Sequence, residues 1–174
     1  MTAFTNAATL ILVPALLTGA TTATAYAETG PTQVKAACAP AALGYEARAR
    51  APIASSVVLI TITNKSGAAC TIDRFPSVTF GDLDGSARPV PATQSGPRQL
   101  AAKGKLYAAL RTDDRSSPAR YVRSLAVSAE PAAEGTRFTA RQIGAPATGI
   151  AVYDPITTLW KQSVDEAVAS LPAS

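Results

Sequence analysis

The stretch from Thr61 to Gly85, TITNKSGAACTIDRFPSVTFGDLDG, constrains the fold of this chain more than any other segment. A β-run ends at Asn64 and is followed by a polar turn, a cysteine, a Phe-Pro pair, a second strand and an Asp-Gly turn. Short strands separated by such turn residues are typical of a small β-sandwich. We interpret the segment as structural, because it contains no arrangement of catalytic side chains.

The composition argues against several functional classes. The chain has 174 residues, enough for one domain, with two cysteines and no histidine. Zinc and copper sites therefore lack ligands, and Ser-His or Cys-His catalysis is excluded. Lys and Arg outnumber Asp and Glu by 16 to 12 but form no clustered basic face of the kind that nucleic-acid binders carry. We expect no cofactor, no metal, no nucleic-acid partner and no enzymatic activity.

The N-terminus resembles a secretory signal peptide. Residues 7–20 (AATLILVPALLTGA) form an apolar run too short to span a bilayer comfortably, and residues 25–27 (AYA) form a small-residue cleavage site. No Lys or Arg precedes the run, so a core helix or a membrane anchor remains an alternative. We expect residues 1–27 to be removed, residues 28–37 to form a flexible N-terminus, and the protein to be secreted rather than integral to a membrane.

Both cysteines, Cys38 and Cys70, follow the expected cleavage site. An even number of cysteines in an exported chain predicts one disulfide. Two free buried thiols are the alternative. Lipid attachment at Cys38 fits less well, because Lys35 stands where the attachment box has an apolar residue.

The alternation of residue types predicts about seven strands. In the clearest, residues 53–63, the side chains of Val58, Ile60 and Ile62 share one face. The other strands are expected at residues 70–72, 77–80, 106–111, 121–128, 137–143 and 149–153, and the alternation at residues 43–48 is interpreted as an additional edge strand. Asp84-Gly85 is expected to form a hairpin turn, and residues 88–104 an irregular crossover. The fold class that follows is an all-β, Ig-like sandwich over residues 38–153.

The last segment, residues 154–174, changes to a helical period. Asp154 is a suitable N-cap and Pro155 stands where the first helical residue belongs. Apolar residues then recur at helical spacing from Ile156 to Leu171. We expect a terminal helix that packs on the sandwich, with a helix that docks on a partner as the alternative.

The central segment resembles a known family. Its Asn64, Cys70-Thr71-Ile72, Phe75-Pro76 and the Asp84-Gly85 turn match the pattern of the domain of unknown function 4232, found in secreted and lipid-anchored proteins of high-GC bacteria. The likeness covers roughly residues 37–153 and includes the step from Lys103 into a strand. It implies an exported β-sandwich with no known enzymatic activity, whose structural motif here is Asn64, Phe75, Pro76 and Gly85. The chain lacks the further cysteines that members often carry, and its C-terminal helix is additional.

Basic residues flank two loops. If both loops lie at the same end of the sandwich, they form a cationic rim for an anionic ligand, since arginine pairs well with phosphate and carboxylate. A scattered, solvated surface is the alternative. The candidate rim residues are Arg98, Lys103, Lys105, Arg111, Arg115, Arg120 and Arg123.

These features favour a non-enzymatic cell-envelope or extracellular binding module, whose partner is an extracellular protein or an anionic cell-wall polymer. A second hypothesis is a protein inhibitor or accessory subunit of a secreted hydrolase, with the proline-rich loop from Arg88 to Arg98 as its reactive segment. A third is a small hydrolase without a recognisable motif. The acidic pairs at 82–84 and 113–114 are interpreted as turn residues rather than calcium ligands.

Overall fold

The computed structural model describes residues 35–50 and 56–173, so the expected signal peptide and cleavage site lie outside the described residues. The described chain is mostly β-structure, with two short α-helices and one turn of 3-10 helix. Its elements are η1 (Pro40–Ala42), β1 (Leu43–Ala49), β2 (Val57–Asn64), β3 (Cys70–Asp73), β4 (Ser77–Phe80), β5 (Leu83–Ser86), β6 (Arg88–Val90), β7 (Pro97–Leu100), β8 (Lys105–Arg111), β9 (Arg120–Val122), β10 (Ser124–Ser128), β11 (Thr136–Thr139), α1 (Ala140–Ile143), β12 (Ile150–Val152), β13 (Ile156–Thr158) and α2 (Val164–Ala169).

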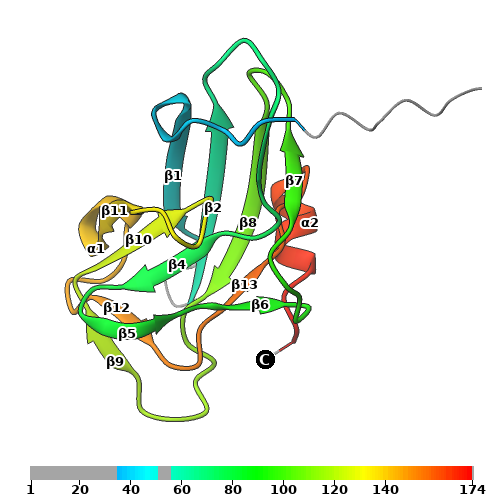
Figure 1. Cartoon of the computed structure of the whole chain (residues 1–174). Helices are drawn as coiled ribbons and strands as arrows, with labels where there is room; N and C mark the ends of the chain where they lie inside the picture. Colours follow the sequence, from blue (N-terminus) through cyan, green and yellow to red (C-terminus); the bar gives the residue numbers. More distant parts are fainter. Residues whose placement is uncertain (1–34, 51–55, 174) are drawn as a thin grey trace, which may run out of the picture. The chain divides into compact units, whose positions relative to one another are not determined.

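Two larger sheets and two ribbons make up the fold (Figure 1). One sheet has the order β1-β2-β8-β13-β6 and the other the order β11-β10-β4-β5. The strand pairs β12-β9 and β3-β7 are separate two-stranded ribbons. One cluster of buried side chains draws on both larger sheets. The expected all-β sandwich with a short C-terminal helix is confirmed.

The core follows from the alternation in β2 and β8. The predicted inward residues of β2 are buried, with Ile60 and Ile62 fully enclosed. Alternate residues of β8, Leu106, Ala108 and Leu110, are buried beside them. Because successive side chains of a strand point to opposite faces, these residues form one continuous apolar surface. The opposite sheet contributes Val78, Phe80, Leu125 and Val127.

Several expected elements are placed differently. The expected strand 121–128 bends at Arg123 into β9 and β10, which belong to different sheets. The expected crossover contains β6, parallel to β13, and β7, antiparallel to β3. The turn between β4 and β5 lies at Gly81-Asp82 instead of Asp84-Gly85. Gly85 has a positive φ of 90°, as the sequence predicted. It lies not in the turn itself but in a β-bulge, where the register between β4 and β5 shifts.

The expected start of the C-terminal helix is wrong. Asp154 has φ 44° and pairs with Arg88 at 2.7 Å, and Ile156–Thr158 form β13 between β8 and β6. Three consecutive residues with β-branched side chains favour a strand over a helix. The helix α2 begins later, and the side chain of Ser163 caps it by accepting the N–H of Glu166.

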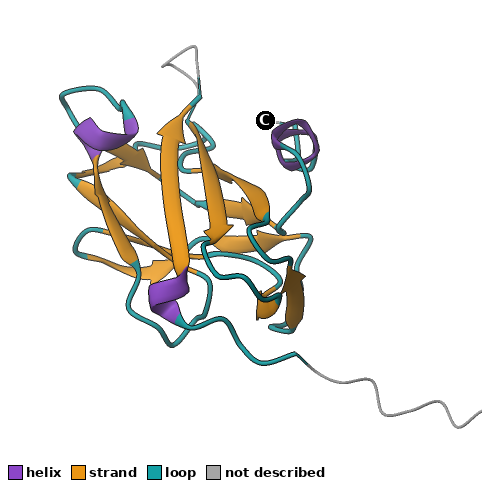
Figure 2. Ribbon diagram, turned by 90° about the horizontal axis from the view of Figure 1, so that it is seen from above, coloured by secondary structure: helices purple, strands orange, loops and turns teal. Residues whose placement is uncertain are grey.

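The helix α2 packs on β8 of its own chain. Ala167 in its middle is fully buried, and the Arg111 guanidinium at the end of β8 donates to the Pro172 carbonyl at 3.0 Å. Figure 2 shows the helix end-on beside the strands. Within the described ranges, no helix is long and apolar enough to cross a membrane.

Candidate functional site

The two cysteines are joined by a disulfide. Cys38 and Cys70 lie with their Cα atoms 5.0 Å apart and their sulfur atoms bonded. The bridge fixes the segment before η1 against β3, where Cys38 N–H also donates to the Thr71 carbonyl at 2.8 Å. The predicted pairing is confirmed, and neither cysteine is available as a nucleophile or a metal ligand.

Asn64 is the structural centre of the motif that carried the family resemblance. Its side chain is fully buried at the end of β2. The Nδ2 group donates to the carbonyls of Ala68 at 2.8 Å and Ala101 at 3.0 Å, and Oδ1 accepts from the backbone and hydroxyl of Ser66. One amide therefore holds two loops, one within the motif and one 37 residues away. The remaining motif residues are also structural: Pro76 is buried directly before β4 and Phe75 is half-buried.

The acidic residues organise loops. Asp113 Oδ1 accepts the N–H of Arg115 at 2.9 Å, and Asp114 Oδ1 accepts the N–H and hydroxyl of Ser116. The backbone hydrogen bond from Ser116 is the main reason that the pKa of Asp114 lies below its ordinary value. Across the part of the chain that the structure describes, no three Cys, Asp or Glu side chains gather to hold a metal ion.

A contact between Ser95 and Asp73 resembles a nucleophile and its base. The Ser95 hydroxyl donates to Asp73 Oδ2, while Oδ1 accepts the N–H of Arg74 at 2.5 Å and that of Gly96 at 3.3 Å. Asp73 is buried. The carboxylate therefore accepts three hydrogen bonds, two of them from main-chain N–H groups. The contact instead anchors the loop of residues 91–96 to β3.

The candidate cationic residues do not form one rim. Lys105 and Arg111 are the first and last residues of β8, so the two groups of basic residues lie at opposite ends of the same strand (Figure 1). Several of them also support backbone groups: Lys103 Nζ donates to the Lys65 carbonyl, and Arg123 donates to the Ala147 carbonyl at 3.3 Å. The geometry therefore separates a β7–β8 group from a β8–β9 group.

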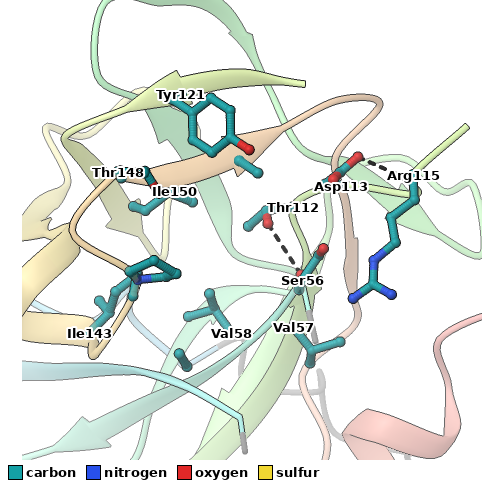
Figure 3. A pocket seen from close by; sticks show the side chains of 15 residues that line it. Ser56, Val57, Val58, Thr112, Asp113, Arg115, Tyr121, Ile143, Thr148 and Ile150 are labelled. Atoms are coloured by element: carbon teal, nitrogen blue, oxygen red, sulfur yellow. Dashed lines mark hydrogen bonds between the residues drawn. The ribbon is translucent and has the colours of Figure 1, made fainter. Parts of the chain in front are cut away.

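A pocket opens at the end of the sandwich where β8 ends and β9 begins (Figure 3). Its volume is about 250 Å³. Three of the apolar side chains that line it are buried and come from different segments: Val58 of β2, Ile143 of α1 and Ile150 of β12. Polar groups line it as well: Ser56, Thr112, Asp113, Arg115 and Thr148. We refer to it as the loop-end pocket.

Tyr121 gives the loop-end pocket its aromatic side. It is 63% exposed, the most exposed large hydrophobic side chain of the described residues. Val122 next to it is buried, so the alternation of β9 directs Tyr121 outward. Sequence reasoning did not select Tyr121. The available signal was an aromatic residue that follows a polar loop and precedes a buried valine.

Hydrogen bonds hold the walls of this pocket. Thr112 donates its N–H to the Ser56 carbonyl at 2.7 Å and its hydroxyl to the same oxygen at 3.2 Å. The Thr112 carbonyl accepts the N–H of Tyr153 at 2.9 Å. Thr112 therefore ties the start of β2 to the end of β12. The pocket is supported by main-chain bonds across three segments, which favours a preformed shape.

The comparisons with known proteins identify a family without an assigned activity. The model of the family described as Domain of unknown function (DUF4232) matches residues 38–160, which confirms the resemblance seen in the sequence. The match begins at Cys38 and extends through β13. No match was found among the curated proteins or among the solved structures.

Proposed function

We propose that this chain, which belongs to the family of the domain of unknown function DUF4232, is a secreted, non-enzymatic module that binds a ligand in the loop-end pocket. The family description assigns no activity, so the proposal rests on the site itself. The disulfide between Cys38 and Cys70 supports an oxidising compartment such as the extracellular space. The signal-like N-terminus supports the same location.

The pocket and Tyr121 carry the proposal. An apolar pocket with a few convergent polar groups is the usual form of a ligand site. Loops on a rigid sandwich are where such modules bind, and aromatic residues are enriched in binding surfaces because they bury a large area at low entropic cost. Tyr121 combines high exposure with a position on the pocket wall.

The balance of charges favours a protein partner over an anionic cell-wall polymer. Asp113 and Arg115 line the same wall, so the pocket is not dominated by one sign of charge. Its buried lining includes the apolar side chains of Val58, Ile143 and Ile150 together with Thr112. A segment of an extracellular protein that inserts an apolar side chain between Tyr121 and Ile150 fits this chemistry. An anionic polymer would instead depend on the candidate basic residues as one set, and these divide between the two ends of β8.

A capture experiment tests the proposal. Immobilised wild-type protein would be exposed to the secreted proteins and to the cell-wall fraction of its host, in parallel with Tyr121→Ala. Tyr153→Ala is the matched control, because Tyr153 is also exposed but lines a separate hollow beside Asp154. We expect a stoichiometric protein partner that Tyr153→Ala retains and Tyr121→Ala loses.

The salt dependence distinguishes the two partner classes. A complex that persists in about 0.5 M salt is held by apolar contact, whereas retention on wall material that is lost at that ionic strength indicates an anionic polymer. Equal retention by wild type and Tyr121→Ala would remove the loop-end pocket as the site. If the immobilised protein retains neither a secreted protein nor wall material, the proposed binding function is wrong.

A second candidate function, inhibition of a secreted hydrolase, is favoured by the loop of residues 91–96. The expected reactive segment begins in β6 and ends in β7, which leaves this exposed loop between them. Its base is fixed by the bonds of Asp73 to Ser95 and Gly96, and Arg74 donates to Thr93 at 3.4 Å. A braced, exposed loop can occupy an active site at low entropic cost.

Titration against a panel of secreted hydrolases tests this candidate. Inhibition should be stoichiometric and should be absent from a variant in which the loop is replaced by glycine and serine. If no enzyme of the panel is inhibited at a several-fold molar excess, the inhibitor hypothesis is wrong. The same panel of substrates, assayed with the protein alone, checks the expectation that the module has no hydrolytic activity.

A further inference from the structure

A second cavity, of about 480 Å³, lies between β7 and β8 at the end of β8 opposite the loop-end pocket. Arg98 and Gln99 of β7, Lys105 of β8 and Gln162 line it. We call it the β7–β8 slot. It shares no lining residue with the loop-end pocket.

The slot exists because two consecutive strands do not pair with each other. A four-residue turn joins β7 to β8, yet β7 pairs with β3 and β8 pairs with β2. Asn64 holds the turn toward β2: its side chain binds the Ala101 carbonyl, and its N–H donates to the Gly104 carbonyl at 3.0 Å. A turn this short normally joins two strands that pair as a hairpin. Because β7 and β8 do not pair here, one edge of each strand faces the cavity between them.

The main-chain groups of Gln99 belong to the free edge of β7. On the side of β3 that faces away from β7, the Thr71 N–H donates to the Ala36 carbonyl, and the Thr71 carbonyl accepts the N–H of Cys38. In an antiparallel ladder, alternate residues direct their N–H and C=O to opposite sides. Cys70 and Ile72 therefore bond to β7, and their partners Leu100 and Arg98 bond back. The groups of Gln99, between these partners, point away from β3.

The main-chain groups of Lys105 face the slot from the other side. Tyr107, two residues later, exchanges both backbone bonds with Lys161, on the side of β8 away from β2. Lys105 has the same parity and so directs its N–H and C=O to that side. In the described residues, neither Gln99 nor Lys105 has a backbone partner on this side. The slot thus presents a donor and an acceptor from each of two strand edges.

The charge of the slot is positive. Arg98 and Lys105 are lining cations, and the Arg98 Nε is buried with no hydrogen-bond partner among the described residues. One carboxylate lies beside them: Glu166 Oε2 accepts the N–H of Gln162 at 3.1 Å. Two cations against one anion leave the slot electropositive, and a buried guanidinium N–H without a partner favours an incoming acceptor.

We propose that the β7–β8 slot binds a short extended segment of a partner protein that carries an acidic side chain. The segment adds as a strand, with main-chain bonds to Gln99 and Lys105 and its carboxylate on Arg98. Strand addition gives affinity through the main chain and selectivity through the side chains between. Pro97 has no N–H to donate, which limits the contact to the part of β7 nearest the turn.

Binding of a labelled model peptide, TVEVEVT, provides the test, with full-length mature protein. Amide NMR spectra should show the largest shifts at the N–H groups of Gln99 and Lys105. Substitution of Arg98→Ala together with Lys105→Ala should weaken binding at least about tenfold. The matched control, Arg123→Ala together with Arg141→Ala, removes the same charge around a different hollow and should change affinity less than about twofold.

Two further peptides separate strand addition from simple anion binding. A peptide with both glutamates replaced by glutamine should bind weakly, and one with a methylated central amide should also bind weakly. If the methylated peptide binds as well as the parent, the slot takes only an anion and the strand-addition proposal is wrong. Absence of binding up to millimolar peptide, or equal binding by Arg98→Ala/Lys105→Ala with unchanged melting, also overturns it. Neither result bears on the loop-end pocket, which Tyr121→Ala tests.

Discussion

At the scale of single residues, Asn64 has the most connected polar side chain of the motif. It ends β2, holds the loop after it, and holds the turn that separates β7 from β8. A fully buried amide that satisfies two carbonyls and one N–H cannot be replaced without leaving polar groups unpaired. The role of Asn64 therefore joins local turn geometry to a long-range contact.

Asn64→Ala should lower the free energy of unfolding by about 2–3 kcal/mol, because the carbonyls of Ala68 and Ala101 lose their donor. Asn64→Asp keeps the size of the side chain but places an oxygen against both carbonyls, so it should destabilise at least as much. Urea unfolding measures both variants. A change below about 0.5 kcal/mol for either would show that water replaces the amide without cost.

Glu130 carries a pH dependence. Its pKa lies above its ordinary value, chiefly because of burial and secondly because of the nearby charge of Asp73. A raised pKa in the folded state means that the protonated form stabilises the fold. This contribution is fully present below the pKa of the unfolded chain and is lost as pH rises through the folded-state pKa.

Glu130→Gln removes this dependence. The melting temperature of the variant, relative to wild type, should therefore increase between about pH 3 and about pH 7. Calorimetry across that range gives the measurement. The Ser128 hydroxyl bonds to the main chain of Glu130 and is unaffected by the change. A relative melting temperature that falls with pH would contradict the assignment.

At the scale of elements, the ribbon β9-β12 and the bulge in β5 each depend on one glycine. Gly149 has φ 114°, and a Cβ there would lie 2.6 Å from the Val122 carbonyl oxygen. Gly85 has φ 90°, but a Cβ there would meet no atom within 4 Å. Both glycines have a positive φ, but only at Gly149 would an added Cβ come into close contact with another atom.

This difference predicts unequal costs for the same substitution. Gly85→Ala should cost about 1 kcal/mol from the positive φ alone. Gly149→Ala should cost at least about 2 kcal/mol more, because the strand carbonyl of Val122 has to move. Denaturant unfolding of the two variants side by side checks the difference. Equal costs would mean that the ribbon adjusts without strain.

The C-terminal segment shows how pairing between elements overrides local pattern. The helical spacing from Ile156 to Leu171 predicted one helix, and the structure divides the segment into β13 and α2. In the antiparallel pairing of β13 with β8, Ile156 lies opposite Arg111 and Thr157 lies opposite Leu110. Burial of these residues between two strands stabilises more than one extra helical turn.

At the scale of the whole molecule, the disulfide connects residues 32 apart along the chain. In the chain-entropy description, closing a loop of this length restricts the unfolded state and stabilises the fold by about 3–4 kcal/mol. The bridge lies at the same end as the β7–β8 slot, because β3 pairs with β7. It therefore supports one of the two proposed sites directly.

The double variant Cys38→Ala/Cys70→Ala should lose about 3–4 kcal/mol and remain folded, since most of the buried core cluster comes from the strands of the two larger sheets rather than from the bridge. Intact mass before and after reduction establishes that the wild-type bridge is present, and thermal unfolding gives the cost. An unchanged melting temperature would show that the bridge is irrelevant to stability.

The sequence by itself determined the sandwich of two packed sheets and the disulfide. The spacing of Val58, Ile60 and Ile62 predicts one buried face because a strand has a period of two, and the two cysteines of the sequence can form one bridge. The tertiary structure alone decided that Ile156 joins a sheet, that the basic residues divide between opposite ends of β8, and that Tyr121 borders a pocket. These outcomes depend on which distant segments come into contact. The local sequence pattern of a strand does not show which other strand it will pair with.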